Sequence, residues 1–143
     1  MTEPLRFLTR REASIFACVC DTVVAPEPVL PPVRDTDAVA SFDRLLARSP
    51  RLNRIGLRAL LYLAELSPRA VRMRRLRALG SAERGVALER LERLRSGARL
   101  IELVEGLACL SYYGDDAVMR RLGYDAGARV ARGRELRARE GRP

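Results

Sequence analysis

The sequence predicts an all-α protein, a single-domain bundle of five or six helices. The core has to be built mainly from Leu, Val and Ala, because the chain contains only four Tyr, three Phe and no Trp. This mixture favours packed helices over a sheet. Apolar residues recur at helical spacing, and the period-two alternation of a half-buried strand is found nowhere. With 143 residues, 48% of them hydrophobic, the chain can bury a core without disulfides or metals.

The first predicted helix begins after Thr9. Thr9 and Glu12 have the T-x-x-E spacing of a capping box, in which each side chain accepts a hydrogen bond from the other residue's backbone N–H. We expect this helix to run to about Val24, and Pro26 ends it. Its expected apolar stripe is Ala13, Phe16, Cys20 and Val23.

A Pro-rich loop follows the first helix over residues 25–34. This proline density forbids a helix and favours an extended segment. The pattern leaves open whether the segment is a plain linker or an arm that wraps another surface. Its prolines are Pro26, Pro28, Pro31 and Pro32.

Two helices are predicted next. Asp35 or Thr36 can cap one that runs to about Arg48, and Ser49-Pro50 has the cap-plus-proline signature of another that runs to about Leu66. The second of these is apolar around most of its girth, so we expect it to be buried on several sides. Its narrow polar stripe is Arg51, Arg54, Arg58 and Glu65.

Positive charge is concentrated in the middle of the chain. The net charge is +9, every cation is Arg, and residues 67–100 hold ten Arg and three acids. Ser67-Pro68 and Gly80 bracket one helical piece, and an amphipathic helix is expected over about 82–96. A basic cluster can bind phosphates or an acidic partner, or can be a solvated face. The cluster is Arg69, Arg72, Arg74, Arg75 and Arg77.

The most hydrophobic helix is expected over residues 98–113 and should be the central one. Gly114 ends it, and Asp115 can cap a short helix from Asp116 to Leu122. Residues 126–143 are rich in Arg, Ala and Gly with few large apolar residues, which predicts a basic, flexible tail. The expected organisation is therefore a helical domain over 1–125 and a tail over 126–143.

The chain lacks the side chains on which most catalytic sites depend. It has neither His nor Lys, which excludes imidazole bases, Schiff bases and phosphate-loop lysines. Glu102 and Glu105 share one helix face without a matching second pair, which favours a solvated strip over a metal site. Three cysteines without His make a poor zinc set or disulfide framework. We expect no enzyme activity, cofactor or metal; the cysteines are Cys18, Cys20 and Cys109.

Three of the four tyrosines lie close together around two glycine turns, in Ser111-Tyr112-Tyr113-Gly114 and Leu122-Gly123-Tyr124-Asp125. Tyrosine suits interfaces because it combines apolar area with a polar tip. The alternative is that these rings pack the end of the bundle and bond to nearby backbone.

Several short motifs, in order and spacing, resemble the gluconate 2-dehydrogenase subunit 3 family over residues 8–125. The last of these motifs in the chain is the most specific: a Tyr-Tyr pair, a short helix and then Leu-Gly-Tyr. The matching segments are Leu8-Thr9-Arg10-Arg11-Glu12, Cys20-Asp21-Thr22-Val23-Val24-Ala25-Pro26, Leu79-Gly80-Ser81-Ala82-Glu83-Arg84, Tyr112-Tyr113-Gly114-Asp115-Asp116 and Leu122-Gly123-Tyr124. Proteins of this family are small helical subunits that accompany a large flavoprotein of the glucose-methanol-choline oxidoreductase type.

The resemblance implies a non-catalytic subunit that binds and stabilises, or helps to mature, a large flavin-dependent sugar or alcohol oxidoreductase. The flavin and the chemistry would belong to the large subunit. The expected contact residues are Tyr112, Tyr113, Leu122, Tyr124, Pro26, Pro28, Pro31 and Pro32. The alternative hypothesis is a nucleic-acid-binding helical protein that uses Arg69–Arg77.

The sequence also bears on location. Arg10-Arg11 precedes the apolar run 15–20, as in a twin-arginine signal, but Asp21 interrupts that run and no small-residue cleavage site follows. No apolar stretch is long enough to span a bilayer. We therefore expect a cytoplasmic protein.

Overall fold

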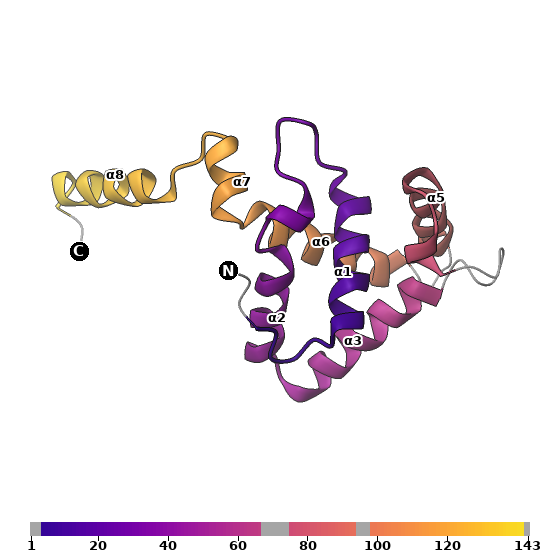
Figure 1. The fold of residues 1–143 in the computed structure, drawn as a ribbon. Coiled ribbons are helices and arrows are strands. Elements are labelled where there is room, and N and C mark those ends of the chain that lie inside the picture. The colour runs from indigo at the N-terminus through magenta and orange to yellow at the C-terminus, as the bar shows by residue number, and fades with distance from the viewer. Residues whose placement is uncertain (1–3, 67–74, 94–97, 142–143) are drawn as a thin grey trace.

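A computed structural model of the chain describes residues 4–66, 75–93 and 98–141. These residues form seven α-helices and two short 3₁₀ turns without a strand, which confirms the predicted helical bundle (Figure 1). The elements are α1 (Arg10–Val24), η1 (Val33–Asp35), α2 (Ala38–Arg48), α3 (Arg51–Leu66), η2 (Leu76–Ala78), α5 (Ser81–Glu92), α6 (Ala98–Tyr113), α7 (Asp116–Arg121) and α8 (Ala126–Arg139).

Helix α1 begins with the predicted capping box. The backbone N–H of Glu12 donates to Thr9 Oγ1 at 3.2 Å, and the backbone N–H of Thr9 donates to Glu12 Oε2 at 2.9 Å. The helix ends at Ala25, whose φ of 41° is left-handed. Phe16 and Cys20 of the predicted stripe are buried, whereas its outer members are half-buried against the core.

Helix α6 occupies the centre, as the sequence predicts. Helices α1, α2, α5 and α7 all pack on it, and its inward face includes Val104 and the fully buried Ala108. Phe16 of α1 and Phe42 of α2 stack at 4.1 Å between ring centroids, with 7° between the ring planes. Large side chains from helices distant in the sequence therefore share one core.

The expectation that α3 is buried on several sides is wrong. One face of this helix enters the core through Leu61 and Ala64, and the opposite face is exposed: Leu52 is 81% exposed and Leu63 is 54% exposed. Apolar residues all round a helix favour burial, but among the described residues no element covers the outer face of α3.

The structure also differs from the prediction at the end of the chain. Residues 126–139 form helix α8, which Asp125 caps by accepting a hydrogen bond from Ala128 N–H at 2.9 Å. The cap and the high helix propensity of Ala and Arg outweigh the two interior glycines. Helix α8 extends away from the bundle (Figure 1). Whether residues 126–143 move independently of the bundle stays a prediction.

Candidate partner-binding surface

Tyr112 lies inside the molecule and not on its surface. Its side chain is completely buried, and its hydroxyl donates a hydrogen bond of 2.7 Å to the carbonyl oxygen of Pro31. Burial raises the pKa of this hydroxyl, and neighbouring Tyr113 and Cys20 add to the shift. Tyr112 is therefore not a contact residue: it packs the end of the bundle and bonds to backbone, which is the alternative that the sequence left open.

Asp115 joins the starts of two helices. Its Oδ1 accepts hydrogen bonds from Ala117 N–H at 2.7 Å and Val118 N–H at 3.2 Å, which caps α7. Its Oδ2 accepts one from Asp37 N–H at 2.7 Å, at the start of α2. The preceding residue has to be glycine, because a Cβ on Gly114 would lie 2.6 Å from the carbonyl oxygen of Leu110. The predicted capping role of Asp115 is confirmed.

The proline arm, residues 25–37, is partly fixed to the bundle by these two bonds. Val33 is buried in the core, and Pro26, Pro31 and Pro32 are half-buried. Pro28 is exposed at the outer end of the arm. The arm forms a loop that projects beyond α1 and α2 (Figure 1). Of the four predicted contact prolines, Pro28 is therefore the most accessible.

The other three predicted contact residues remain accessible. Tyr113 and Tyr124 are each 42% exposed and Leu122 is 55% exposed. Gly123, with φ of 72°, turns the chain so that Tyr124 lies beside a hollow between α7 and the start of α8. The guanidinium of Arg129 lies 4.8 Å from the Tyr124 ring centroid. These residues form an accessible, partly aromatic end of the bundle.

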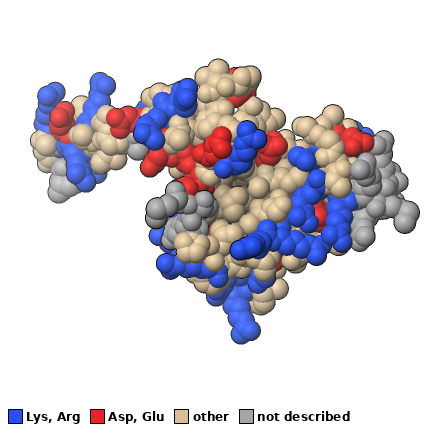
Figure 2. All heavy atoms as spheres, viewed as in Figure 1, with Lys and Arg blue, Asp and Glu red and all other residues tan. Residues whose placement is uncertain are grey.

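The basic segment is only partly available. Arg69, Arg72 and Arg74 lie outside the described residues. Arg75 is exposed, but Arg77 Nε donates to Glu65 Oε1 at 3.0 Å, and Arg77 also bonds to Ser14 Oγ. Glu65 is completely buried, so Arg77 neutralises a carboxylate that would otherwise be costly to bury. On the visible face, arginines lie around α2 and α3 and along α8, and acidic side chains gather near α7 (Figure 2).

Asp43 fixes the N-terminal segment to α2, which the sequence did not predict. Its carboxylate accepts hydrogen bonds from the backbone N–H groups of Arg6, Phe7 and Leu8 at 2.8, 3.0 and 2.7 Å. Burial alone would raise the pKa of Asp43, but these bonds outweigh it and lower the pKa. One signal was available: an acidic residue directly after Phe42 on a buried helix face needs partners.

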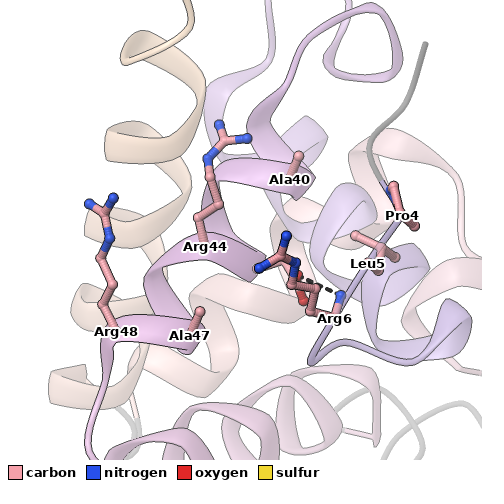
Figure 3. Close-up of a pocket in the computed structure, with 8 residues that line it drawn as sticks. Pro4, Leu5, Arg6, Ala40, Arg44, Ala47 and Arg48 are labelled. Carbon is pink, nitrogen blue, oxygen red and sulfur yellow. Dashed lines mark hydrogen bonds between the residues drawn. The ribbon is translucent and has the colours of Figure 1, made fainter.

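A pocket of about 220 Å³ lies beside Asp43. Figure 3 shows Arg6 of the N-terminal segment next to α2, from which Arg44 and Arg48 extend. The rim is cationic, and the carboxylate in the pocket is already bound by backbone N–H groups.

The cysteines are free thiols. Cys20 is buried and its Sγ lies 3.7 Å from the carbonyl oxygen of Ala108; burial raises its pKa to about 12. Burial also raises the pKa of Cys18. Such thiols stay protonated and unreactive at neutral pH. Within the described ranges, no three Cys, Asp or Glu side chains are grouped as metal ligands.

Comparison of the chain with protein-family models, curated proteins and solved structures gives no match. No helix in the described part of the chain has the length and apolar character needed to cross a bilayer.

Proposed function

We propose that this chain is a non-catalytic subunit that binds and stabilises a larger flavin-dependent sugar or alcohol oxidoreductase of the glucose-methanol-choline type. One observation carries the proposal: the Tyr-Tyr to Leu-Gly-Tyr region divides into a fixed half and an accessible half. Tyr112 and Asp115 are bound internally, whereas Tyr113, Leu122 and Tyr124 remain exposed on the same end of the bundle.

Rigid positioning of exposed aromatic groups suits protein recognition, because less conformational entropy is lost on binding. Aromatic side chains are enriched in the buried centres of interfaces. Tyr113 directly follows Tyr112, and Leu122 and Tyr124 follow helix α7, whose start Asp115 caps, so the internal bonds of Tyr112 and Asp115 support the positions of all three. The contact surface is therefore proposed to comprise Tyr113, Leu122 and Tyr124, with Pro28 at the outer end of the arm.

The test is co-expression with a large flavoprotein encoded beside this chain, followed by purification through a tag on the small chain. The expected result is a complex that carries the visible absorbance of flavin. Leu122→Ser combined with Tyr124→Ala should reduce the recovered flavoprotein at least about tenfold, since interface anchors cost about 2 kcal/mol or more when truncated. Leu52→Ser, at an exposed residue of α3, is the matched control and should leave recovery unchanged. A purified chain without flavoprotein, under conditions where both proteins fold, would contradict the proposal.

Nucleic-acid binding is the second candidate, and one observation favours it. Helix α8 presents exposed arginines on an element that extends from the bundle (Figures 1 and 2). Phosphate contacts release counterions, so affinity for DNA or RNA would fall steeply as salt increases. Binding that is absent, or that does not respond to salt, would remove this candidate. The exposed arginines of α8 are Arg129, Arg132, Arg134, Arg137 and Arg139.

A further inference from the structure

The outer face of helix α3 is an apolar stripe. Its members recur every three or four residues, a spacing that places them on one face of the helix. Their exposed fractions include 81% at Leu52 and 41% at Leu66, the two ends of the stripe. Every member is apolar and exposed to solvent. We call this face the α3 stripe, made of Leu52, Ile55, Gly56, Ala59, Leu63 and Leu66.

The α3 stripe follows almost the whole length of its helix. From Leu52 to Leu66 it extends roughly 20 Å, at about 1.5 Å per residue. The opposite face of α3 packs on α1 and η2, and the helix runs along the edge of the bundle (Figure 1). Helical spacing places the uncharged residues Asn53 and Leu60 on one flank of the stripe. A flat surface can therefore touch the stripe along its length.

Helix α3 and the two elements packed on it expose little negative charge. The acids of α1, α3 and η2 are Glu12, Asp21 and Glu65. Glu12 and Glu65 are fully buried, and each is bound to an arginine. Asp21 is half-exposed near the end of α1, where it lies 3.8 Å from Arg84. The surroundings of the stripe therefore do not repel an anionic surface.

Exposed arginines border the stripe on its other flank. Helical spacing places exposed Arg51 and half-buried Tyr62 on this flank. The guanidinium of exposed Arg11 lies 5.5 Å from the Tyr62 ring centroid, so α1 adds a second cation there. Exposed Arg48 lies at the corner between α2 and α3, just before the stripe begins. Arg58 shares the flank, but it is bound to a buried carboxylate and is not counted.

We propose that the α3 stripe docks the chain on the surface of a bilayer that contains anionic lipids. The leucines and Ile55 enter the boundary between headgroups and acyl chains, as the apolar faces of interfacial helices do. Arg11, Arg48 and Arg51 bind the lipid phosphates. Helix α3 lies parallel to the membrane in this arrangement and does not cross it.

An anionic bilayer matches both properties of this surface. Exposed apolar patches rimmed by polar residues mark protein or membrane contacts. Nucleic acid presents phosphates without an apolar layer that could take up a row of leucines. Membrane affinity grows with the buried apolar area and with attraction to anionic lipids, and the stripe and its arginines supply both. This docking does not rest on the proposed flavoprotein partner.

Co-sedimentation of the full chain with lipid vesicles tests the proposal. We expect binding to vesicles of phosphatidylglycerol and phosphatidylcholine in equal parts, weakening as salt rises. Binding to phosphatidylcholine alone should be at least about tenfold weaker. Leu52→Ser combined with Leu63→Ser should lower the partition coefficient at least about tenfold, because less apolar surface enters the membrane. Val29→Ser is the matched control, since Val29 is 67% exposed but lies on the proline arm, and should bind like the unchanged chain.

Removal of charge tests the arginines separately. Arg48→Gln combined with Arg51→Gln should weaken binding to the phosphatidylglycerol vesicles at least about tenfold. The matched control is Arg132→Gln combined with Arg134→Gln, which removes the same charge from α8. This control should weaken binding less than about twofold, because α8 is not part of the docking surface. Equal losses in the two double variants would show attraction by net charge alone and would overturn the proposal.

A fluorescent probe tests whether the stripe itself enters the membrane. The chain contains no Trp, so Leu63→Trp provides a single indole in the stripe. Its emission should shift to shorter wavelength when the phosphatidylglycerol vesicles are added, and that of Val29→Trp should not. Circular dichroism checks that every variant folds. The proposal is overturned if the chain does not bind these vesicles, or if the leucine changes release the flavoprotein but leave vesicle binding intact.

Discussion

Side chains have opposite roles in two regions of the molecule. Asp43, Tyr112 and Asp115, which we call the tether residues, are buried and bind backbone groups of remote segments. The outer faces of α3 and α6 instead leave leucines such as Leu52 and Leu110 open to solvent. The tether residues hold remote segments of the fold together, whereas the exposed leucines contribute little to the stability of the chain. Changes at the tether residues should therefore lower the stability much more than changes at the exposed leucines.

The largest expected effect is at Asp43. Asp43→Ala removes the acceptor of three backbone N–H groups, and we expect it to lower the free energy of unfolding by about 3 kcal/mol. Urea unfolding followed by circular dichroism measures this. Asp35→Ala is the control, since the Asp35 side chain is 60% exposed, and should change stability by less than about 0.5 kcal/mol. Equal losses at both positions would show that Asp43 is not a tether.

The next largest expected effect is a loss of stability in acid, caused by protonation of Glu12 and Asp43. Burial opposes ionisation of both, but hydrogen bonds from Arg58 and Thr9 to Glu12, and from backbone N–H groups to Asp43, lower both pKa values below their ordinary values of 4.5 and 3.8. The stability they contribute is therefore complete above those values, and it is lost as pH falls through the lower folded pKa values. Unfolding curves recorded between neutral pH and about pH 2 should show this decline.

Glu12→Gln combined with Asp43→Asn tests the source of that decline. The double variant should be less stable at neutral pH, and its stability should depend less on pH in the acid range than that of the unchanged chain. An identical acid dependence in both proteins would assign the decline to other carboxylates.

A smaller effect is expected at Tyr112. Tyr112→Phe keeps the ring and removes the hydroxyl that donates to Pro31 O at 2.7 Å, so the loss should be about 1 kcal/mol. Amide hydrogen exchange should become faster in the proline arm and stay unchanged in α3, where no tether residue acts. Tyr113→Phe is the matched control, because that side chain is 42% exposed. Faster exchange throughout the bundle would contradict a local role.

The smallest effect on stability is expected on the outer face of α3. Leu52→Ser changes a side chain that is 81% exposed, and the free energy of unfolding of the monomer should change by less than about 0.5 kcal/mol. The measurement is urea unfolding followed by circular dichroism. A loss as large as that of a buried leucine, about 3 kcal/mol, would mean that this side chain is covered within the monomer.

The contrast between the regions also explains what the sequence could predict. The Thr9–Glu12 box and the Asp115 cap lie within three residues of their partners, so local spacing identifies them. Periodicity likewise identifies the central α6. Tyr112 binds Pro31, and Asp115 binds Asp37 just before α2. These partners lie 81 and 78 residues away, so no local sequence pattern identifies them. Because apolar residues occur nearly all round α3, its sequence alone does not show which side of the helix packs against the core. Helix α8 forms although it has few large apolar residues, because Asp125 caps its start.

For the candidate site, the sequence singled out one end of the bundle but did not separate its buried from its exposed members. Tyr112 and Tyr113 are adjacent and chemically alike, yet one is buried and the other is 42% exposed. Their directions differ because successive residues on a helix point about 100° apart. Only the position of the core decides which of the two is covered.

The bonds from Tyr112 and Asp115 to the proline arm have a consequence for synthesis. The proline arm is synthesised early. The residues that bind it, Tyr112 at the end of α6 and Asp115 just before α7, follow roughly eighty residues later. During translation, contacts between the arm and α1 can form early, but these two hydrogen bonds cannot form until Gly114 and Asp115 have left the ribosome. A chain released before that point would keep a proline-rich segment available to proteases and chaperones.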